Sequence, residues 1–168
     1  MSGMATDSAK RDGPPLLFHS GGQFYCPTFE QDAQAAYIPS RDVVTMPSRT
    51  AFESQAEYYS TLFHELTHST GHAKRLAREG FDTPQKFGSE SYSREELIAE
   101  MGSAMLCGVA GIEQNTLANS AAYLKTWIAR LKADSKLVIS AASAAQKAAD
   151  YIRGESAKDS PAGESHAS

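Results

Sequence analysis

Two histidines and a glutamate at helical spacing are the residues of this chain best suited to chemistry. The segment His64-Glu65-Leu66-Thr67-His68 reads H-E-x-x-H within a stretch of helical periodicity. Residues four apart lie above one another on a helix face, so His64 and His68 can bind one metal ion together. Glu65 is rotated by about 100° from His64 and can reach a water molecule held at that metal. Two imidazoles with an open coordination position suit a catalytic zinc ion, and the carboxylate suits a general base.

A catalytic zinc ion usually has three protein ligands and one water, so a third ligand must come from elsewhere in the chain. The segment Glu96-Leu97-Ile98-Ala99-Glu100 reads E-x-x-A-E on a second predicted helix, and it resembles the third-ligand helices of glutamate-zincin enzymes. In those enzymes the first acid binds the metal, and the acid four residues later hydrogen-bonds a ligand histidine and fixes its tautomer. The resemblance therefore assigns Glu96 to the metal and Glu100 to that hydrogen bond.

Alternatives to these assignments stay open at the level of sequence. H-E-x-x-H is a short pattern that also occurs by chance on helices with two unrelated histidines. Glu96 and Glu100 can exchange roles. Both can also be solvated acids near a helix N-terminus, where negative charge is favoured.

Two further residues near these segments are candidates for other roles in the site. A third histidine in the arrangement H-E-x-x-H-x-x-G-x-x-H would stand at position 74, which is lysine, so that arrangement is broken. His72 follows the predicted helix end at Gly71, and we assign it to a capping or supporting role rather than to the metal. His72 and Tyr92 are both candidates to donate a hydrogen bond to the oxyanion of a transition state, and the sequence does not choose between them.

The residues before the first helix read as short strands and turns. Residues 16–25 carry apolar and aromatic stretches broken by a Gly-Gly turn. Residues 35–39 and 43–46 flank a polar turn and predict a β-hairpin. Ile38 or residues 43–46 could form an edge strand that pairs with an extended peptide, as edge strands do in zinc peptidases, and a purely structural hairpin is the alternative.

From residue 48 onward the apolar residues recur at helical spacing. The first helix is predicted over residues 52–70, with Gly71 placed to end it. The second is predicted to begin at a capping box, with Ser93 at the N-cap and Glu96 three residues later, and to run to about Leu106.

Two further apolar stripes, over residues 117–131 and 137–152, predict another pair of helices. The whole pattern predicts an α+β fold, in which a small antiparallel sheet is followed by a bundle of about four helices. We expect one folded domain over residues 16–153. The segments 1–15 and 154–168 are poor in apolar residues and are expected to be disordered tails.

Charge and hydropathy exclude several classes of function. The 168 residues carry a net charge of −4 and a pI near 5.7, whereas a mainly electrostatic nucleic-acid binder would usually be basic. No apolar stretch approaches the roughly 18 residues that span a bilayer. The first 15 residues hold no apolar signal-peptide core, so we expect a cytoplasmic protein that does not bind membranes.

The cysteines and the clustered basic residues carry little functional signal. Cys26 and Cys107 lack C-x-x-C spacing, and Cys107 lies in an apolar run that suits a buried small hydrophobe. Lys74, Arg75 and Arg78 form a short basic cluster, for which we favour a solvated patch over contact with phosphate.

Two long motifs resemble the zincin-like metallopeptidase domain of ArdC-type antirestriction proteins, which also occurs in polyvalent proteins of phages and conjugative plasmids. The first motif is Y-Y-x-T-L-x-H-E-L-T-H-x-T-G-H at residues 58–72, and the second is S-R-E-E-L-I-A-E-M-G at residues 93–102. The segment A-A-Q-K-A-A-D-Y at residues 144–151 is also typical of that domain. The resemblance covers about residues 16–153, and the motifs stand in the family's order.

The resemblance implies a zincin-like metallopeptidase fold, a zinc ion bound by His64, His68 and Glu96, and Glu65 as the general base. It also implies a link to antirestriction or to mobile genetic elements. Proteins of the family usually carry an N-terminal domain that binds single-stranded DNA, and no segment of this sequence corresponds to it. We therefore expect a protein or peptide substrate and no DNA binding by this chain alone.

The leading hypothesis is a zinc-dependent peptidase, in which Glu65 takes a proton from the attacking water and later returns it to the leaving amine. The alternative is a non-catalytic module that protects DNA or binds a partner, with a structural or vestigial zinc site. A protease that cuts a single repressor is a third hypothesis. The intact Glu65 favours an enzyme, because a structural zinc site does not need that acid. Two histidines and a carboxylate can also hold other divalent metals, such as manganese or iron.

Overall fold

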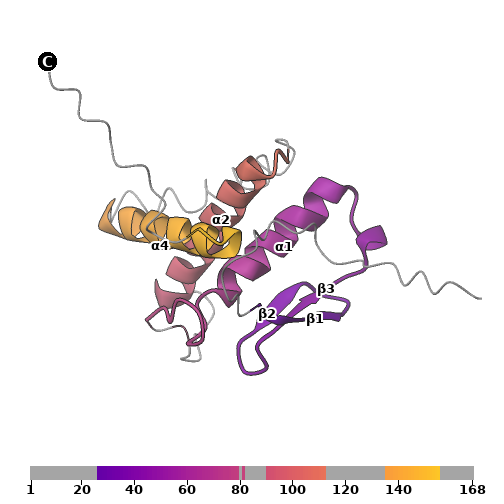
Figure 1. Cartoon of the computed structure of the whole chain (residues 1–168), viewed down its shortest axis with the longest axis horizontal. Coiled ribbons are helices and arrows are strands. Elements are labelled where there is room, and N and C mark those ends of the chain that lie inside the picture. Colours follow the sequence, from indigo (N-terminus) through magenta and orange to yellow (C-terminus); the bar gives the residue numbers. More distant parts are fainter. Residues whose placement is uncertain (1–25, 80, 82–89, 113–134, 156–168) are drawn as a thin grey trace, which may run out of the picture.

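A small sheet followed by long helices makes up the part of the chain that the computed structural model describes, which is residues 26–79, 81, 90–112 and 135–155 (Figure 1). This arrangement confirms the predicted α+β fold. The predicted strands within residues 16–25 and the predicted helix at 117–131 lie outside the described residues, as do most of the two tails. The elements are β1 (Thr28–Gln31), β2 (Ala36–Ile38), β3 (Val43–Met46), the 3-10 turn η1 (Arg49–Ala51), α1 (Gln55–Ser69), α2 (Glu90–Val109) and α4 (Ser135–Arg153).

The sheet is mixed rather than purely antiparallel. Its strand order is β1-β3-β2. The predicted hairpin is confirmed, because β2 runs antiparallel to β3 with Tyr37 opposite Val44. However, β1 pairs in parallel with β3, on the other side from β2. Since β3 is therefore the central strand, residues 43–46 cannot serve as an edge, and of the two segments considered only the one containing Ile38 lies on an edge strand.

The start of α1 is fixed by a serine and a glutamate. Ser54 is the N-cap, and its hydroxyl accepts a hydrogen bond from the backbone N–H of Glu57 at 3.1 Å. The carboxylate of Glu57 in turn accepts from the N–H of Glu53 at 2.8 Å. The first bond satisfies an N–H group that the first helical turn leaves without a partner, and the second ties the residue before the N-cap to the helix. The register of the H-E-x-x-H segment is thus set within the helix's own sequence.

Gly71 follows the end of α1, but glycine is required there for a different reason from the one that the sequence suggested. Its N–H donates to the carbonyl of His68 at 2.9 Å, as expected just beyond the helix. Its backbone does not adopt the left-handed conformation that usually selects glycine there. A Cβ at this position would instead lie 2.4 Å from the ring of Phe81. Glycine is required here because the chain returns closely over the helix end.

Helix α2 begins earlier than predicted. It starts at Glu90, so Ser93 is a buried residue inside the helix and the predicted capping box at 93–96 is wrong. The same S-x-x-E pattern occurs at Ser54, where it does cap a helix. A local pattern of four residues cannot distinguish a helix start from a helix interior when the preceding residues also continue the helix.

Close contact between α1 and α2 brings their polar faces together. A Cβ at Gly102 would lie 2.6 Å from the side chain of Thr67, so only glycine allows this approach. The hydroxyl of Ser103 also donates to the carbonyl of Ser60 at 2.8 Å. These contacts fix the distance between the two helices that carry the candidate site residues.

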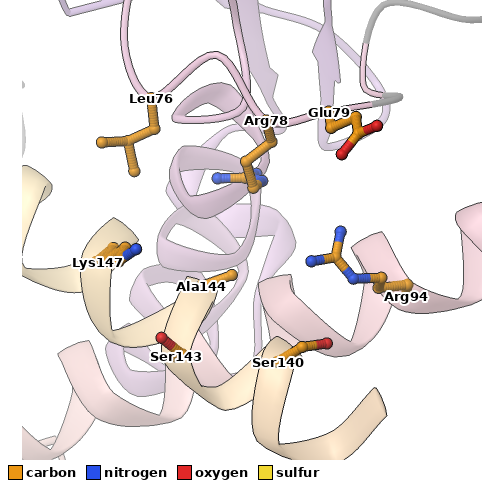
Figure 2. Close-up of a pocket in the computed structure, with 8 residues that line it drawn as sticks. All are labelled: Leu76, Arg78, Glu79, Arg94, Ser140, Ser143, Ala144 and Lys147. Carbon is orange, nitrogen blue, oxygen red and sulfur yellow. The ribbon is translucent and has the colours of Figure 1, made fainter. Parts of the chain in front are cut away.

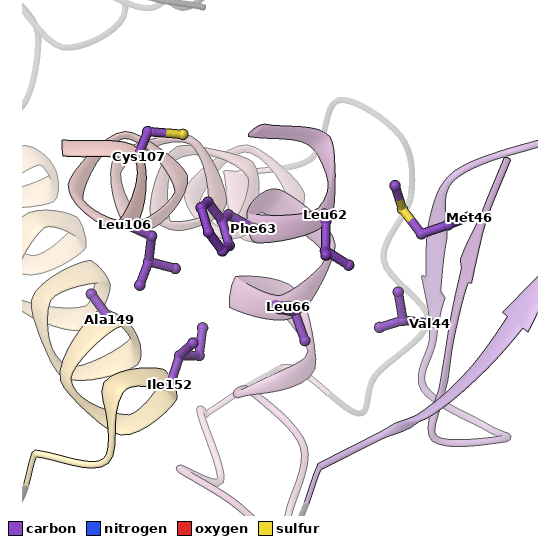
Figure 3. Packing of buried hydrophobic residues seen from close by; sticks show 9 residues of the cluster. All are labelled: Val44, Met46, Leu62, Phe63, Leu66, Leu106, Cys107, Ala149 and Ile152. Carbon is purple, nitrogen blue, oxygen red and sulfur yellow. The ribbon is translucent and has the colours of Figure 1, made fainter. Parts of the chain in front are cut away.

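The hydrophobic core surrounds α1, which packs against the sheet and against α2 (Figures 1 and 3). Figure 3 shows Leu62 and Leu66 pointing toward the sheet, and Phe63 pointing toward α2. Cys107 is buried, as predicted, and both cysteines are free. None of the described helices is both long and apolar enough to span a bilayer. The core residues are Val44, Met46, Leu62, Phe63, Leu66, Leu106, Cys107, Ala149 and Ile152.

Small residues allow α4 to cover α2. Ala141 and Ala145 are fully buried against Leu97 and Ile98. This is the apolar stripe that the sequence predicts for the last helix. It fixes the buried face of α2, so that the opposite face turns toward the histidines of α1.

Candidate metal centre

Three side chains from α1 and α2 converge on one point. The Nε2 atoms of His64 and His68 lie 3.1 Å apart. The carboxylate oxygens of Glu96 lie 3.6 Å from the Nε2 atom of His64 and 3.6 Å from that of His68. Ligand atoms bound at about 2.0–2.1 Å to a tetrahedral zinc ion stand about 3.3 Å apart. The three spacings therefore fit a single divalent metal ion, and these residues are the metal-ligand group that the described part of the chain contains.

The other ring nitrogens face carboxylates. Nδ1 of His68 lies 3.3 Å from Glu95, and Nδ1 of His64 lies 3.6 Å from Glu100. A proton on each Nδ1 satisfies these contacts and leaves a lone pair on each Nε2. Two such lone pairs at 3.1 Å, with a carboxylate beside them, repel one another unless a cation lies between them. The donor set thus fits a bound metal ion.

Glu95 and Arg78 are parts of the site that sequence reasoning missed. Arg78 Nε donates to Glu95 Oε2 at 3.0 Å, and the two side chains form a buried ion pair. Arg78 Nη2 also donates to the carbonyls of Thr67 and His68, at 3.0 and 3.2 Å. One guanidinium therefore caps α1 and holds the carboxylate that orients His68.

The prediction that Arg75 and Arg78 lie in a solvated patch is wrong. Their side chains are 1% and 8% exposed, and each pairs with a carboxylate from a distant segment. Their position in the sequence could have indicated this, because basic side chains just beyond a helix often hydrogen-bond its last carbonyl groups. Lys74, at 60% exposed, fits the prediction.

Burial and neighbouring groups shift the pKa values of the three acids of the centre in different directions. Burial opposes ionisation of Glu96, yet its hydrogen bonds to His64 and Tyr92 and the nearby imidazoles lower its pKa. Burial likewise opposes ionisation of Glu95, and the bonds to His68 and Arg78 lower its pKa overall. For Glu100, burial prevails with the help of the neighbouring Glu96, and its pKa is raised. The pKa is thus lowered for the two acids that accept hydrogen bonds from His64, His68, Arg78 or Tyr92, and raised for the acid that lies beside another acid.

Glu65 is held by the edge strand of the sheet. Its Oε2 atom accepts a hydrogen bond from the backbone N–H of Tyr37 at 2.8 Å. Tyr37 lies on β2, which has no strand neighbour on that side among the described residues. The carboxylate therefore lies between the H-E-x-x-H helix and the free edge of the sheet.

A buried ion pair fixes this strand to the end of α1. Arg75 pairs with Asp42 of the hairpin turn, and its Nε donates to the carbonyl of Ser69 at 2.6 Å. The hydroxyl of Tyr37 donates to Asp42 at 2.9 Å and accepts from Arg75 Nη2 at 2.9 Å. Although burial works in the opposite direction, the bonds from Arg75 and Tyr37 lower the pKa of Asp42 to about 2. The network holds the donor of Glu65 in place.

Replacing Arg75 by methionine should lower the free energy of unfolding by about 1–3 kcal/mol at neutral pH, because the partly buried Asp42 would lose its guanidinium partner and keep only the exposed Lys74 and the Tyr37 hydroxyl. Urea denaturation measures this change. Arg41→Met is the matched control, since the Arg41–Glu30 pair is about half exposed and such pairs contribute about 0–1 kcal/mol. Equal losses in the two variants would contradict the assignment of Arg75.

The same ion pair should give a defined pH dependence. Asp42 has its pKa lowered in the folded state to about 2, against about 3.9 in an unfolded chain. Its contribution to stability is therefore fully present above pH ~4 and is lost as the pH falls toward 2. The stability difference between the wild type and Arg75→Met should shrink over that interval.

The remaining candidates lie in different places. Tyr92 hydrogen-bonds Glu96, so its hydroxyl is at the metal centre. His72 lies beyond α1, where its Nδ1 accepts from the backbone N–H of Lys74 at 3.2 Å. His72 is not among the described residues that converge on the metal centre. Of the two candidates for an oxyanion donor, the structure places only Tyr92 beside the proposed ligands.

Comparison with known proteins finds one matching family and several similar chains. Residues 25–144 match the zincin-like metallopeptidase family. A DNA primase TraC of Escherichia coli is 43% identical over 119 residues, which are 71% of this chain and 8% of that protein. The uncharacterized protein y4eC of Sinorhizobium fredii is 36% identical over 123 residues, which are 73% of this chain and 39% of that protein.

Solved structures of antirestriction protein ArdC from plasmid R388 share this fold. The Mn(II)-bound structure has a TM-score of 0.63 and 40% identity, and the match covers 80% of this chain and 49% of that one. The metal-free structure has a TM-score of 0.60, also at 40% identity, and the match covers 76% and 45%. The chain thus spans half or less of the length of these relatives. The matches confirm the resemblance to ArdC-type proteins.

Proposed function

Since this chain belongs to the zincin-like metallopeptidase family, we propose that it is a metal-dependent peptidase. One observation carries the proposal. Ligand atoms of His64, His68 and Glu96 converge within 3.1–3.6 Å, and, against the effect of burial, the carboxylate of Glu65 is near enough to help raise the pKa of His64. A site that only stabilised the fold would need the three ligands but not the neighbouring acid.

In this proposal the residues of the chain divide the reaction between them. A divalent metal ion held by His64, His68 and Glu96 would polarise a peptide carbonyl and make a water molecule more acidic. Glu65 takes the proton of that water as it attacks, and later passes the proton to the leaving amine nitrogen. The N–H of Tyr37 orients Glu65 for both transfers.

The residues behind the ligands keep the imidazoles in one orientation. Glu95 lies within hydrogen-bond distance of Nδ1 of His68, and Glu100 faces Nδ1 of His64 at 3.6 Å, so that both acids favour a proton on Nδ1 and leave the Nε2 atoms available. Arg78 holds Glu95 in position. We therefore assign Glu100 to orienting His64 and Glu96 to the metal, as the sequence resemblance implies.

We propose zinc as the resident metal. Two imidazoles and a carboxylate at tetrahedral spacing suit zinc, and the same donors also accept manganese. A solved relative is described as Mn(II)-bound. Metal analysis of the purified protein distinguishes the two.

We place the activity in the cytoplasm and in the biology of mobile DNA. The relatives include an antirestriction protein from a plasmid and a DNA primase. A peptidase in that setting would act on a protein or peptide partner. The acidic net charge of this chain is consistent with a substrate other than DNA.

A second candidate function is a non-catalytic module with a structural metal ion. The names of the relatives favour it, since they describe antirestriction and DNA priming rather than peptide hydrolysis. In that case the metal would stabilise α1 against α2, and hydrolysis would not occur.

Removing and restoring the metal tests the proposed function. The metal-loaded protein should cleave members of a peptide library, as read by mass spectrometry. Chelation should remove the cleavage, and added Zn²⁺ or Mn²⁺ should restore it. Metal bound without any cleavage of peptides or of candidate partner proteins would favour the non-catalytic module.

A further inference from the structure

A polar pocket lies between the loop that follows α1, the first turns of α2, and α4 (Figure 2). It has a volume of about 720 Å³. Neither the proposed metal ligands nor Glu65 line it, and it adjoins the metal centre only through Arg78, which holds Glu95. Its lining residues are Leu76, Arg78, Glu79, Arg94, Ser140, Ser143, Ala144 and Lys147.

Basic side chains enter this pocket from facing elements. Figure 2 shows the guanidinium of Arg94 and the ammonium of Lys147 directed into the hollow from α2 and α4, with Arg78 between them. Arg78 is already paired with Glu95. No ion pair joins Arg94 or Lys147 to another residue in the described part of the chain. Within the described residues, these two cationic groups therefore face the hollow without an ion-pair partner.

The single carboxylate of the lining, Glu79, does not cancel this charge. Glu79 is an exposed residue of the loop, and it forms no ion pair with Arg94 within the described residues. Among the described residues, three cations and one anion line the pocket, and one of those cations is neutralised by Glu95. The described part of the lining thus carries a net positive charge, although the chain as a whole is acidic.

Hydroxyl groups along one face of α4 add to the cationic groups. Ser140, Ser143 and Lys147 lie three and four residues apart, so they share a face of the helix. The small side chain of Ala144 on the same face leaves space above it. The hydroxyl of Ser140 donates to the carbonyl of Leu137 at 3.0 Å, and that of Ser143 is exposed. A hydroxyl rotates freely enough to donate to an anion that enters.

We propose that this pocket binds a small phosphorylated ligand. A guanidinium offers two parallel N–H groups to phosphate oxygens, and an ammonium and a hydroxyl complete the set of donors that phosphate binders use. The volume falls within the roughly 300–1,000 Å³ of small-molecule sites, so there is space for more than the phosphate itself.

The layout of the charges favours a small molecule over a nucleic-acid strand. A strand is bound along an extended groove by many phosphate contacts. Here Arg94 and Lys147 face one hollow from opposite walls. A compact phosphorylated group fits between them, whereas successive phosphates of a strand would require further cations along a track.

Isothermal titration calorimetry of the full chain with pyrophosphate tests the proposal. The wild type should bind pyrophosphate saturably. Arg94→Ala and Lys147→Ala should each weaken binding by about 10–100-fold, since each removes a charge-assisted contact. Glu79→Gln should strengthen binding severalfold, because it removes the only negative charge of the lining.

Lys136→Ala is the matched control, since it removes the same charge from α4 outside the pocket. It should leave the affinity unchanged. An equal loss in Lys136→Ala and Lys147→Ala, or no saturable binding by the folded wild type, would overturn the proposal. A single-stranded oligonucleotide that binds more tightly than pyrophosphate, and that loses its affinity in Arg94→Ala, would overturn the assignment to a small molecule.

The proposal does not depend on peptidase activity. Binding of pyrophosphate can be measured on protein without metal and without any peptide. Far-UV circular dichroism of each variant shows whether it is folded, so a loss of binding in a folded variant reports on the pocket alone.

Discussion

Replacing Glu65 by glutamine should reduce peptide hydrolysis by about 10²–10⁴-fold, the usual contribution of a positioned general base. Glutamine keeps the shape of the side chain, and its carbonyl oxygen can still accept the hydrogen bond from the Tyr37 amide. It cannot take a proton from water. The rate should therefore fall without a change in metal content, and initial rates on a cleaved library peptide would measure the loss.

Glu53→Gln is the control for this change. It removes one acid just before α1, at an exposed position away from the metal centre. Its rate should match that of the wild type. Undiminished hydrolysis in Glu65→Gln would exclude Glu65 as the base, and a simultaneous loss of metal would show that the variant had disturbed the ligands instead.

Replacing His64 by alanine should abolish tight metal binding. The variant would lose one of three ligand atoms, and the remaining Nε2 atom and carboxylate cannot complete a tetrahedral site. Elemental mass spectrometry of dialysed protein should show about one metal ion per wild-type chain and almost none in the variant. His72→Ala is the matched control, because His72 lies just beyond the same helix but outside the centre.

The same measurement separates the two glutamates of α2. Glu96→Ala should behave like His64→Ala, whereas Glu100→Ala should weaken metal affinity by about 10–100-fold, as expected when a residue that orients a ligand is lost. The opposite order would exchange the two roles. Metal retained at the wild-type level in His64→Ala would place the site elsewhere.

The sequence predicted those parts of the molecule whose causes are local. The apolar spacing of Leu62, Phe63 and Leu66 marks the buried face of α1, and His64, Glu65 and His68 lie on another face of the same helix. Two apolar segments that flank a polar turn mark the β2–β3 hairpin. In each case a short stretch of sequence is sufficient, because the side chains that form the pattern are close together in the chain.

The features that the sequence did not predict depend on partners far apart in the chain. The parallel pairing of β1 with β3 leaves no periodic trace in either strand. Arg75 and Arg78 read as surface charges until Asp42 and Glu95 are seen to pair with them. Glu95 itself stands beside the residue assigned to the metal, and only the approach of α2 to α1 shows which neighbour it touches.

Because Glu65 is hydrogen-bonded to the Tyr37 amide, the site depends on two regions that can unfold locally and independently, the helices and the edge strand. The proposed metal ligands lie on two long, closely packed helices, whereas the amide belongs to an edge strand of three residues. Transient local unfolding of that strand would release Glu65 without moving the ligands. Amide hydrogen exchange at Tyr37 would then report the fraction of time that the base is unconstrained, and turnover could vary with hairpin fluctuations while metal affinity stayed constant.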